Sequence, residues 1–355
     1  MKLTDVCDFQ GGSQPPKEEW SYKKQDGFIR MLQIRDFTQS EKVTPEYIKL
    51  RNNTKICEAD DILIARYGAS IGKILTGLAG AYNVAIMRTI PDETILKKRY
   101  LYYYLKSSYF QNNILNVGSR AAQAGFNKED LSKLSIHCPK IEEQDDIADI
   151  LEKVEKIIAE RERELKLLEE FIKARFVEIF GDPVTNSMGW PKKRFDEICE
   201  NLDSKRKPIT ESEREAGIYP YYGASGIVDH VADYIFDEDI LLVSEDGANL
   251  LMRSTPIAFS VNGKVWVNNH AHVVRFKKIS MQKYIEVYFS LIDISDQITG
   301  SAQPKLNQAK LNAMQFAIPE DRLMDKYYEF VAQIDKSKVV VERSLKKCKI
   351  LKVWI

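Results

Sequence analysis

Residues 142–180 read EEQDDIADILEKVEKIIAERERELKLLEEFIKARFVEIF, and this stretch decides the fold. Apolar residues recur in it in steps of three and four positions between runs of charged residues, which is typical of a long helix with one apolar seam. Packing against another element supplies most of the stability of such a helix, so we expect a partner for the seam. Gly181 and Pro183 then end the helical pattern.

The last stretch of the sequence, residues 320–355, repeats this pattern at an offset of 180 positions. Because one chain carries both helices, they are expected to pair with each other as an antiparallel coiled coil. A lone solvated helix and a dimerisation arm are the alternatives. The second seam is more polar than the first. The predicted seam residues of the two helices are Ile147, Leu151, Val154, Ile158, Leu165, Leu168, Ile172, Val331, Ile334, Val341 and Leu345.

The segments that precede the two helices also repeat each other. Asn127 matches Asn307 at an offset of 180, and DILI at 61–64 matches DILL at 239–242 at an offset of 178. The offset changes along the chain, so the loops differ in length between the halves. The sequence therefore predicts a tandem duplication with four parts: a globular domain at 1–139, a helix at 140–181, a second globular domain at 182–319 and a second helix at 320–355.

Each globular part is expected to be an α+β domain, with a small β-rich sheet plus helices. Short apolar runs punctuated by Gly, Asn, Asp and Pro indicate strands. One tyrosine-rich helix is expected in each part, at 100–107 and 284–291. The predicted strands include 61–65, 85–90, 240–243, 257–261 and 265–267.

Composition limits the possible classes of protein. The 355 residues carry 52 Lys and Arg against 52 Asp and Glu, and 44% of them are hydrophobic, which excludes wholesale disorder. No uncharged stretch is long enough to span a membrane, and residues 1–5 lack an apolar signal core, so we expect a cytoplasmic protein without membrane contact. The neutral total disfavours a protein that coats nucleic acid by bulk charge alone.

The motifs of common enzyme and metal sites are missing. The sequence has no phosphate-binding GxxxxGK[ST] loop, no GxGxxG, no HExxH and no GxSxG elbow. Its five cysteines form no CxxC pair, so neither zinc nor a redox pair is indicated. His270 and His272 are the only close histidine pair, and no cluster of further ligands accompanies them. We expect no catalytic residue and no metal, and a binding role ranks above catalysis.

Several strings of the sequence resemble the specificity subunit of type I restriction-modification systems. The resemblance covers both halves and the order of the strings. The two domain ends, IHCP at 136–139 and AIP at 317–319, are similar to the family's approach to the spacer helix, although Leu323-Met324 stands where the first half has Glu143-Gln144. The other strings are DDILIARYGASIGK at 60–73, YPYYGASGI at 219–227, DGAN at 246–249 and VNGKVWVNNHAH at 261–272.

The resemblance implies two target-recognition domains, each reading one half of a bipartite site in double-stranded DNA. The paired spacer helices would fix the gap between the half-sites and dock two modification (methyltransferase) subunits, and restriction subunits would join the complex. This chain would be non-catalytic and carry no cofactor. S-adenosylmethionine, ATP and magnesium would belong to the partner subunits.

Candidate DNA contacts in the first domain are Arg66, Tyr67, Lys73, Arg120 and Gln123. Arg66 and Tyr67 follow a predicted strand, and Arg120 and Gln123 lie in a loop of small residues that DNA could approach closely. Arg and Gln can contact guanine and adenine edges with two hydrogen bonds each. An ion pair within the domain is the alternative for Arg66, and a solvated or phosphate-binding lysine is the alternative for Lys73.

In the second domain, the basic loop at 204–207 suits phosphate groups, although an ordinary exposed turn explains it equally well. Gln303 and Lys305 occupy the loop that matches Arg120 and Gln123 in the duplication. Capping of buried turns is the alternative for the asparagines. The candidates in this domain are Lys205, Arg206, Lys207, Asn249, Asn269, His270, His272, Gln303 and Lys305.

The neutral total conceals an uneven distribution of charge. The four predicted parts carry net charges of +5, −5, −3 and +3 in chain order. The acidic second domain is awkward for a protein that binds DNA alone, but suits a subunit whose partners supply much of the phosphate contact. Two other hypotheses stay open: a non-catalytic protein-binding scaffold with duplicated β-rich domains on a coiled-coil spine, and an enzyme with an unrecognised site.

Overall fold

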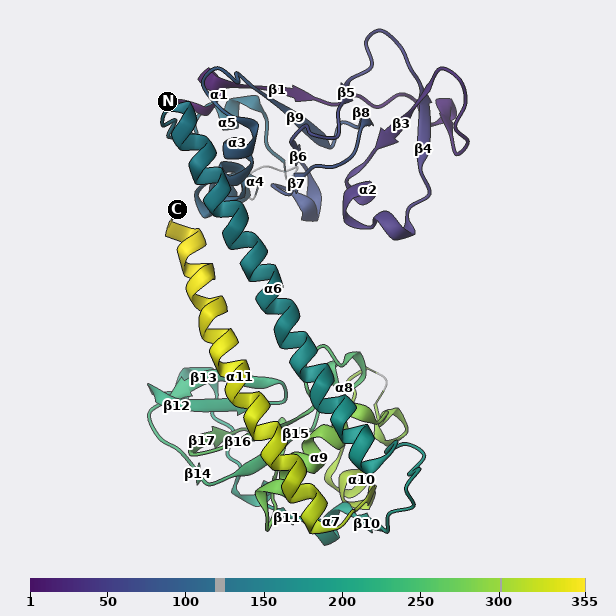
Figure 1. The fold of residues 1–355 in the computed structure, drawn as a ribbon, viewed down its shortest axis with the longest axis vertical. Helices are drawn as coiled ribbons and strands as arrows, with labels where there is room; N and C mark the ends of the chain where they lie inside the picture. Colours follow the sequence, from purple (N-terminus) through teal and green to yellow (C-terminus); the bar gives the residue numbers. More distant parts are fainter. Residues whose placement is uncertain (119–124, 301, 355) are drawn as a thin grey trace. The chain divides into compact units, whose positions relative to one another are not determined.

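The computed structural model describes residues 1–118, 125–300 and 302–354 (Figure 1). The chain divides into two compact units: Met1–Glu160 with Leu345–Ile355, and Arg161–Ser344. Each unit contains one globular domain and parts of the two long helices, so each is considered by itself.

The first unit contains two small sheets. A four-stranded sheet has the order β1-β9-β6-β7, and a five-stranded sheet has the order β2-β4-β3-β8-β5. Its strands are β1 (Cys7–Gly11), β2 (Trp20–Ser21), β3 (Phe28–Leu32), β4 (Glu46–Lys49), β5 (Ile56–Cys57), β6 (Leu63–Ala65), β7 (Ile74–Leu75), β8 (Gly80–Tyr82) and β9 (Ile86–Pro91).

The second unit repeats these sheets. One has the order β11-β18-β15-β16 and the other β13-β12-β17-β14, and a two-stranded sheet joins β10 to β19. The strands are β10 (Lys192–Arg194), β11 (Glu200–Asn201), β12 (Ala216–Gly223), β13 (Gly226–Val231), β14 (Phe236–Asp237), β15 (Ile240–Ser244), β16 (Ala258–Val261), β17 (Lys264–Val267), β18 (Ala271–Arg275) and β19 (Gln315–Ala317).

The strand order confirms the duplication. In both four-stranded sheets the strand that includes residues of DILI or DILL is central, and all of its pairings are antiparallel. In both second sheets one pair is parallel, β3 with β8 and β12 with β17. The sequence suggested one sheet in each domain, whereas the structure has two, because β3 and β12 belong to a separate sheet that turn-rich segments connect to the first.

Helices cover the four-stranded sheets and complete the cores. Leu101 and Leu105 of α3 are fully buried in the first unit, as are Tyr284 and Phe289 of α9 in the second. The helices other than the two long ones are α1 (Leu3–Val6), α2 (Ile34–Thr38), α3 (Lys98–Lys106), α4 (Ser108–Gly118), α5 (Lys128–Leu131), α7 (Phe195–Ile198), α8 (Asn249–Met252), α9 (Ile279–Leu291) and α10 (Gln308–Ala313).

The two long helices are α6 (Ile141–Phe180) and α11 (Asp321–Trp354). Acidic residues in the first turn of α6 stabilise the N-terminal end of this helix by a favourable interaction with the helix dipole. Gly181 ends α6 with a positive φ of 78°, and a Cβ at this position would lie 2.4 Å from the Ser187 hydroxyl, so glycine is required here.

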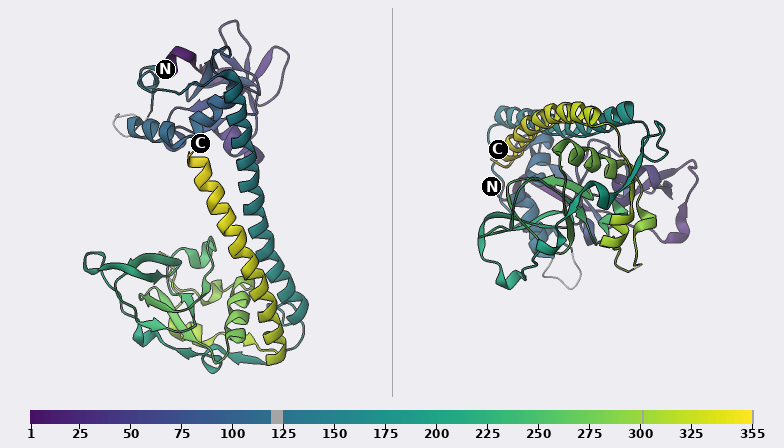
Figure 2. Two further views of the ribbon diagram at one scale, coloured as in Figure 1. Left: turned by 60° about the vertical axis from the view of Figure 1, so that its left-hand side comes forward. Right: turned by 90° about the horizontal axis from the view of Figure 1, so that it is seen from below.

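The long helices pair in opposite directions, as expected for an antiparallel coiled coil. In the second unit the Tyr327 hydroxyl donates to Ile172 O (3.0 Å), and farther along α11 Lys338 pairs with Glu169 (3.5 Å). Figure 2 shows the two helices side by side there. Of the predicted seam residues in this unit, Ile172, Val331 and Val341 are buried and Leu165, Leu168 and Ile334 are half-buried.

The first unit contains the other ends of the same two helices. Lys352 of α11 pairs with Glu155 of α6 at 2.6 Å. Of the predicted seam residues in this unit, Leu151 and Val154 are buried and Ile147, Ile158 and Leu345 are half-buried.

The first turns of the long helices are held by different chemistry. Gln144 is fully buried, accepts a hydrogen bond from Lys97 N (2.9 Å) and donates to Ile95 O (2.8 Å) and Pro139 O (2.9 Å). The duplicated position in α11 is Met324, which is also fully buried and packs in the core of the second unit. A polar clamp in the first half therefore corresponds to an apolar contact in the second.

Candidate nucleic-acid interface

Arg66 and Tyr67 directly follow strand β6 of the first unit. All three β6 residues are buried, so the first side chains that can reach solvent follow the strand directly. Arg66 N donates to Ala85 O (2.8 Å), and Tyr67 forms an isolated bridge with Gly125. A Cβ at Gly125 would lie 2.3 Å from the Tyr67 ring, so this close approach requires a glycine.

The Arg66 guanidinium is positioned without a carboxylate. It lies 5.0 Å from the Tyr67 ring centroid, and its Nε donates to Phe126 O at 3.3 Å. Among residues 1–118, 125–300 and 302–354, no acidic side chain pairs with it. The ion pair considered as an alternative for Arg66 is therefore absent from this part of the chain. The terminal N–H groups of the guanidinium can make a bidentate contact with guanine.

The other predicted contacts of this domain are less well defined. Lys73 is exposed and has no polar partner for its ammonium group within the described residues. Arg120 and Gln123 lie outside the described residues.

In the second unit, four segments meet at the end of strand β15. Glu245 N donates to His270 O (2.9 Å), and Leu306 N donates to Glu245 O (2.8 Å). Gly247 N donates to Pro304 O at 3.0 Å. These backbone bonds bring the segments after β15, before β18 and before α10 to one edge, and the segment after β11 completes it.

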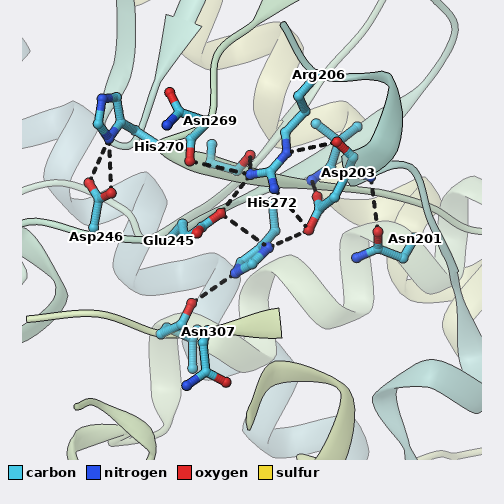
Figure 3. Close-up of polar contacts among 12 residues, drawn as sticks. Asn201, Asp203, Arg206, Glu245, Asp246, Asn269, His270, His272 and Asn307 are labelled. Atoms are coloured by element: carbon cyan, nitrogen blue, oxygen red, sulfur yellow. Dashed lines mark hydrogen bonds and ion pairs between the residues drawn. The ribbon is translucent and has the colours of Figure 1, made fainter. Parts of the chain in front are cut away.

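A network of charged side chains fills this edge (Figure 3). Arg206 donates from Nη1 to a Glu245 carboxylate oxygen (2.7 Å) and to Ala271 O (2.7 Å), and its Nη2 lies 3.3 Å from Asp203 Oδ2. His272 lies below Arg206 with its Nδ1 2.6 Å from Asp203 Oδ2. Burial leaves the side chain of His272 only 1% exposed and that of Arg206 13% exposed.

The two carboxylates of the network are held in the charged form. Burial alone would raise the pKa of Asp203, but hydrogen bonds from His272 and the backbone of Val273, together with the Arg206 charge, hold that pKa below its usual value. Burial also opposes the ionisation of Glu245, yet Arg206, His272 and Lys305 hold its pKa below the usual value as well. The network is therefore ionic rather than neutral.

Three of the predicted DNA contacts have side chains that are already engaged within the domain. Arg206 is occupied by two carboxylates and by backbone oxygens, and His272 is buried with both ring nitrogens in contact with acceptors. Asn249 accepts from Thr255 N (3.0 Å) and from the Ser254 hydroxyl (2.9 Å), and its amide donates back to Thr255 O (3.1 Å). Asn249 is thus a loop cap, the alternative raised for the asparagines, and Arg206 and His272 belong to the internal network.

The remaining candidates are exposed. Lys205, Lys207, Asn269 and Gln303 have no polar side-chain partner among the described residues. Two others are partly engaged: His270 Nδ1 lies 2.9 Å from Asp246, and Lys305 Nζ lies 3.1 Å from Glu245, each with a side chain 49% exposed. These side chains surround the ionic network and face solvent.

The strand pairings place the two edges in correspondence. The same asparagine cap, Asn83 or Asn268, precedes a matching backbone bond: Arg66 N donates to Ala85 O in the first unit, and Glu245 N donates to His270 O in the second. The bridge from Tyr67 to Gly125 likewise matches the bridge from Asp246 to Lys305. Arg66 therefore takes the place of Glu245, and Met87, two residues after Ala85, takes the place of His272, two residues after His270.

The third member of the network is also absent from the first domain. Phe9 pairs with Thr89, two residues after Met87, and Asn201 pairs with Val274, two residues after His272. Counting on from these pairs places Gly11 at the position of Asp203. A Cβ at Gly11 would lie 3.2 Å from Arg66 Nη1, so a larger residue would crowd the guanidinium.

Sequence reasoning missed Asp203 and Glu245, which organise the second edge. Both stand next to strings that were singled out, Asp203 before the basic loop and Glu245 before DGAN. An acidic residue three positions before Arg206 was the available signal. It also missed the turn cap Asn83, whose side chain accepts from Ala85 N at 3.1 Å. The equivalent cap, Asn268, accepts from His270 N at 2.8 Å and is one of the asparagines for which turn capping was the alternative.

Asp203, Glu245 and His272 together offer three ligand atoms within 4.8 Å of one another, as a metal site would. However, Arg206 and Lys305 already neutralise both carboxylates. The donor set thus fits ion pairing better than a divalent cation, and we assign it to ion pairing.

The fold and the two edges define a class of protein: two copies of one binding domain, each presenting polar side chains at the end of a central strand, joined by an antiparallel pair of helices. Residues 1–170 and 188–347 each match the type I restriction modification DNA specificity domain. The chain belongs to this family.

Individual relatives agree with the family match. A type I restriction enzyme specificity subunit of Haemophilus influenzae is 35% identical over 36% of this chain and 32% of its own length. The specificity subunit of the type I restriction enzyme MjaVIII of Methanocaldococcus jannaschii is 24% identical over 62% of this chain and 54% of its own length. The matched segments thus span about a third and about half of these relatives.

A solved structure shares the fold. The S subunit of a type I restriction-modification system from M. genitalium superposes with a TM-score of 0.56 at 16% identity, over 99% of this chain and 93% of its own. Among the residues that the structure describes, no helix is both long and apolar enough to cross a membrane.

Proposed function

We propose that this chain is the non-catalytic, DNA-reading subunit of a type I restriction-modification complex, each domain reading one half of a split target. One observation carries the proposal: equivalent strand ends in both domains present polar side chains that reach solvent. These are the half-buried Arg66 and the exposed Lys73 in the first domain, and the exposed Lys207 and Asn269 in the second. Residues of these types read base edges or bind phosphates.

The proposed roles differ between these residues. Arg66, as a positioned guanidinium, suits a base contact, and Asn269 suits an adenine edge. Lys73, Lys205 and Lys207 suit phosphate groups, which fix the register of the protein on DNA without specifying sequence. Methylation with S-adenosylmethionine, and ATP- and magnesium-dependent cleavage, would belong to modification and restriction subunits.

The outer faces of the long helices support docking of modification subunits. Ile150 and Ile157 in the first unit are 47% and 39% exposed, and Leu167 and Phe171 in the second are 52% and 50% exposed. Apolar residues seven or four positions apart lie on one face of a helix, and an exposed apolar face is typical of an interaction surface. A non-catalytic protein-binding scaffold would use the same faces but would not need the polar strand ends.

Selection from a pool of random duplexes tests the reading function. The chain assembled with two modification subunits should enrich a bipartite motif, and its affinity should fall steeply with salt. Arg66→Gln should weaken one half of the motif and Lys207→Gln should lower affinity for all duplexes. If the assembled complex enriches no motif, the scaffold hypothesis replaces this one.

The helices would also act as a ruler between the half-sites. The 40 residues of α6 correspond to a length of about 60 Å at ~1.5 Å per residue. Four residues inserted after Glu164, with four at Val341 in the facing part of α11, add about 6 Å of helix. The gap in the enriched motif should widen by one or two base pairs, and an unchanged gap would contradict the ruler.

A further inference from the structure

His272 is a buried histidine whose two ring nitrogens both face hydrogen-bond acceptors (Figure 3). Nδ1 lies 2.6 Å from the Asp203 carboxylate, and Nε2 lies 2.8 Å from the backbone oxygen of Leu306. A backbone oxygen can only accept, and the Asp203 carboxylate also accepts from Val273 N (2.8 Å). Each ring nitrogen must therefore carry a proton, which makes the ring an imidazolium.

The charges around the ring fit this form. The second carboxylate, Glu245, lies 3.6 Å from Nδ1. Arg206 and Lys305 pair with the two carboxylates from the solvent side. A charged ring at the bottom of the network thus makes two charge-assisted hydrogen bonds and has both carboxylates near Nδ1, whereas a neutral ring would leave one acceptor unsatisfied in a buried place.

The two acceptors belong to different loops. Asp203 begins the loop that carries Lys205 and Lys207, and Leu306 follows the loop that carries Gln303 and Lys305. His272 lies in β18, which the exposed Asn269 precedes by a few residues. A single ring therefore connects the three segments that bear the exposed polar side chains of the second edge.

The first domain lacks this connection. Met87 occupies the position of His272 and is buried in an apolar environment, with glycine and arginine in place of the two carboxylates. The device therefore belongs to the second domain and is not a requirement of the shared fold.

We propose that His272, held as an imidazolium between Asp203 and the Leu306 backbone, is a positioning residue that sets the base preference of the second half-site. The inference rests on the proposed DNA-reading function. His272 would act by fixing the positions of the loops that it connects, because bidentate base contacts tolerate displacements of only a fraction of an ångström.

The matched variants are His272→Gln and His230→Gln. Glutamine at 272 can donate to Asp203 but cannot span both acceptors in the geometry of the ring, whereas His230 is exposed and its side chain has no hydrogen-bond partner among the described residues. Selection from random duplexes with the assembled complex should show at least a tenfold loss of discrimination in the second half-site for His272→Gln. The first half-site should be unchanged, and His230→Gln should match the wild type in both.

A second measurement does not depend on DNA. The chain has four histidines, so nitrogen-15 labelling of histidine gives few signals in the intact chain. Long-range proton–nitrogen spectra at neutral pH should show both ring nitrogens of His272 in the protonated state, assigned by loss of the signals in His272→Gln. A ring with one unprotonated nitrogen overturns the proposal, even if the variant folds poorly.

The outcomes separate this inference from the function beneath it. If the wild-type complex enriches no motif, the DNA-reading function fails. If it enriches a bipartite motif and His272→Gln keeps both halves at full discrimination, only the role of His272 is wrong. If both halves weaken equally, the histidine stabilises the chain as a whole and does not position one edge.

Discussion

The ends of β6 and β15 occupy the same place in two copies of one domain, yet carry opposite charges. Arg66 follows β6 and contacts a tyrosine ring and a backbone oxygen. Glu245 occupies the equivalent position after β15 and forms ion pairs with Arg206 and Lys305. The turn caps Asn83 and Asn268 are the same in both. The duplication has thus kept the scaffold of the edge and changed its electrostatics.

This difference shows how one fold can present two different polar surfaces. In the first domain an unpaired cation is itself the polar surface. In the second domain the cations nearest the strand, Arg206 and Lys305, form ion pairs within the domain. The polar surface is formed by the exposed side chains around these ion pairs. Substitution of the charged residue that follows the central strand should therefore act mainly on recognition in the first domain and mainly on stability in the second.

The largest expected effect is that of Asp203→Ala. It leaves His272 and Arg206 buried without one of their acceptors, which should lower the free energy of unfolding of the second unit by about 3–5 kcal/mol. Hydrogen exchange should show lost protection of the β15 and β18 amides and unchanged β6 and β9 amides. Asp196→Ala, which breaks an exposed pair with Arg194, is the control and should leave both sets unchanged. Equal loss of protection in both units would mean that the network is not local to its domain.

Arg66→Gln should have the next largest effect, and on recognition. Loss of a bidentate contact to guanine should reduce discrimination in one half-site by about 1–3 kcal/mol. Thermal unfolding should shift little, because Arg66 makes one backbone hydrogen bond. Arg51→Gln, which removes an exposed pair with Glu19 in the same domain, is the control and should leave discrimination intact. Comparison of selected duplex pools measures this effect, and unchanged discrimination would assign Arg66 to the scaffold.

Low pH should destabilise the edge of the second domain more than that of the first, and this effect should be smaller than the two above. The pKa values of Asp203 and Glu245 are lower in the folded chain than their usual values, so their ionised forms stabilise the second unit above about pH 4. That contribution is lost as the pH falls further, through the folded-state pKa values. Protection factors measured from pH 6 to pH 3 should decrease at Val273 N before they decrease at Arg66 N. The reverse order would show that the network does not control acid stability at this edge.

The smallest effect should come from the paired substitutions Lys305→Gln and Lys73→Gln. Both remove a charge near DNA and should lower the slope of affinity against salt by about one unit. Only Lys305 has a carboxylate partner, so only its loss should change stability, by about 0.2–1 kcal/mol. Salt titration and urea unfolding of both variants measure the two effects. A larger stability loss at Lys73 would contradict the open character of the first edge.

The sequence predicts the features that are periodic or local. The seam from Ile147 to Ile172 and the match of Asn127 to Asn307 are sufficient for the helices and the duplication. DILI and DILL locate the two central strands, and the residues after them locate the candidate edges. The family resemblance follows from the same strings.

The ionic network could not be predicted in this way. Asp203 and His272 are 69 positions apart, and Arg206 and Glu245 are 39 apart, so their contacts depend on strand order and register. The offset between the halves also changes between 178 and 192, which hides the replacement of His272 by Met87. Charged residues in loops have an ordinary solvated explanation, and only packing shows which of them are buried.

The first turns of the two spacer helices should respond differently to temperature. Met324 is held by burial of apolar surface, which weakens as water is cooled, whereas Gln144 is held by three hydrogen bonds that lack this dependence. Cooling should therefore loosen the start of α11 before that of α6. On cooling, the second half of the chain would therefore lose the contacts at the start of its long helix at a higher temperature than the first half.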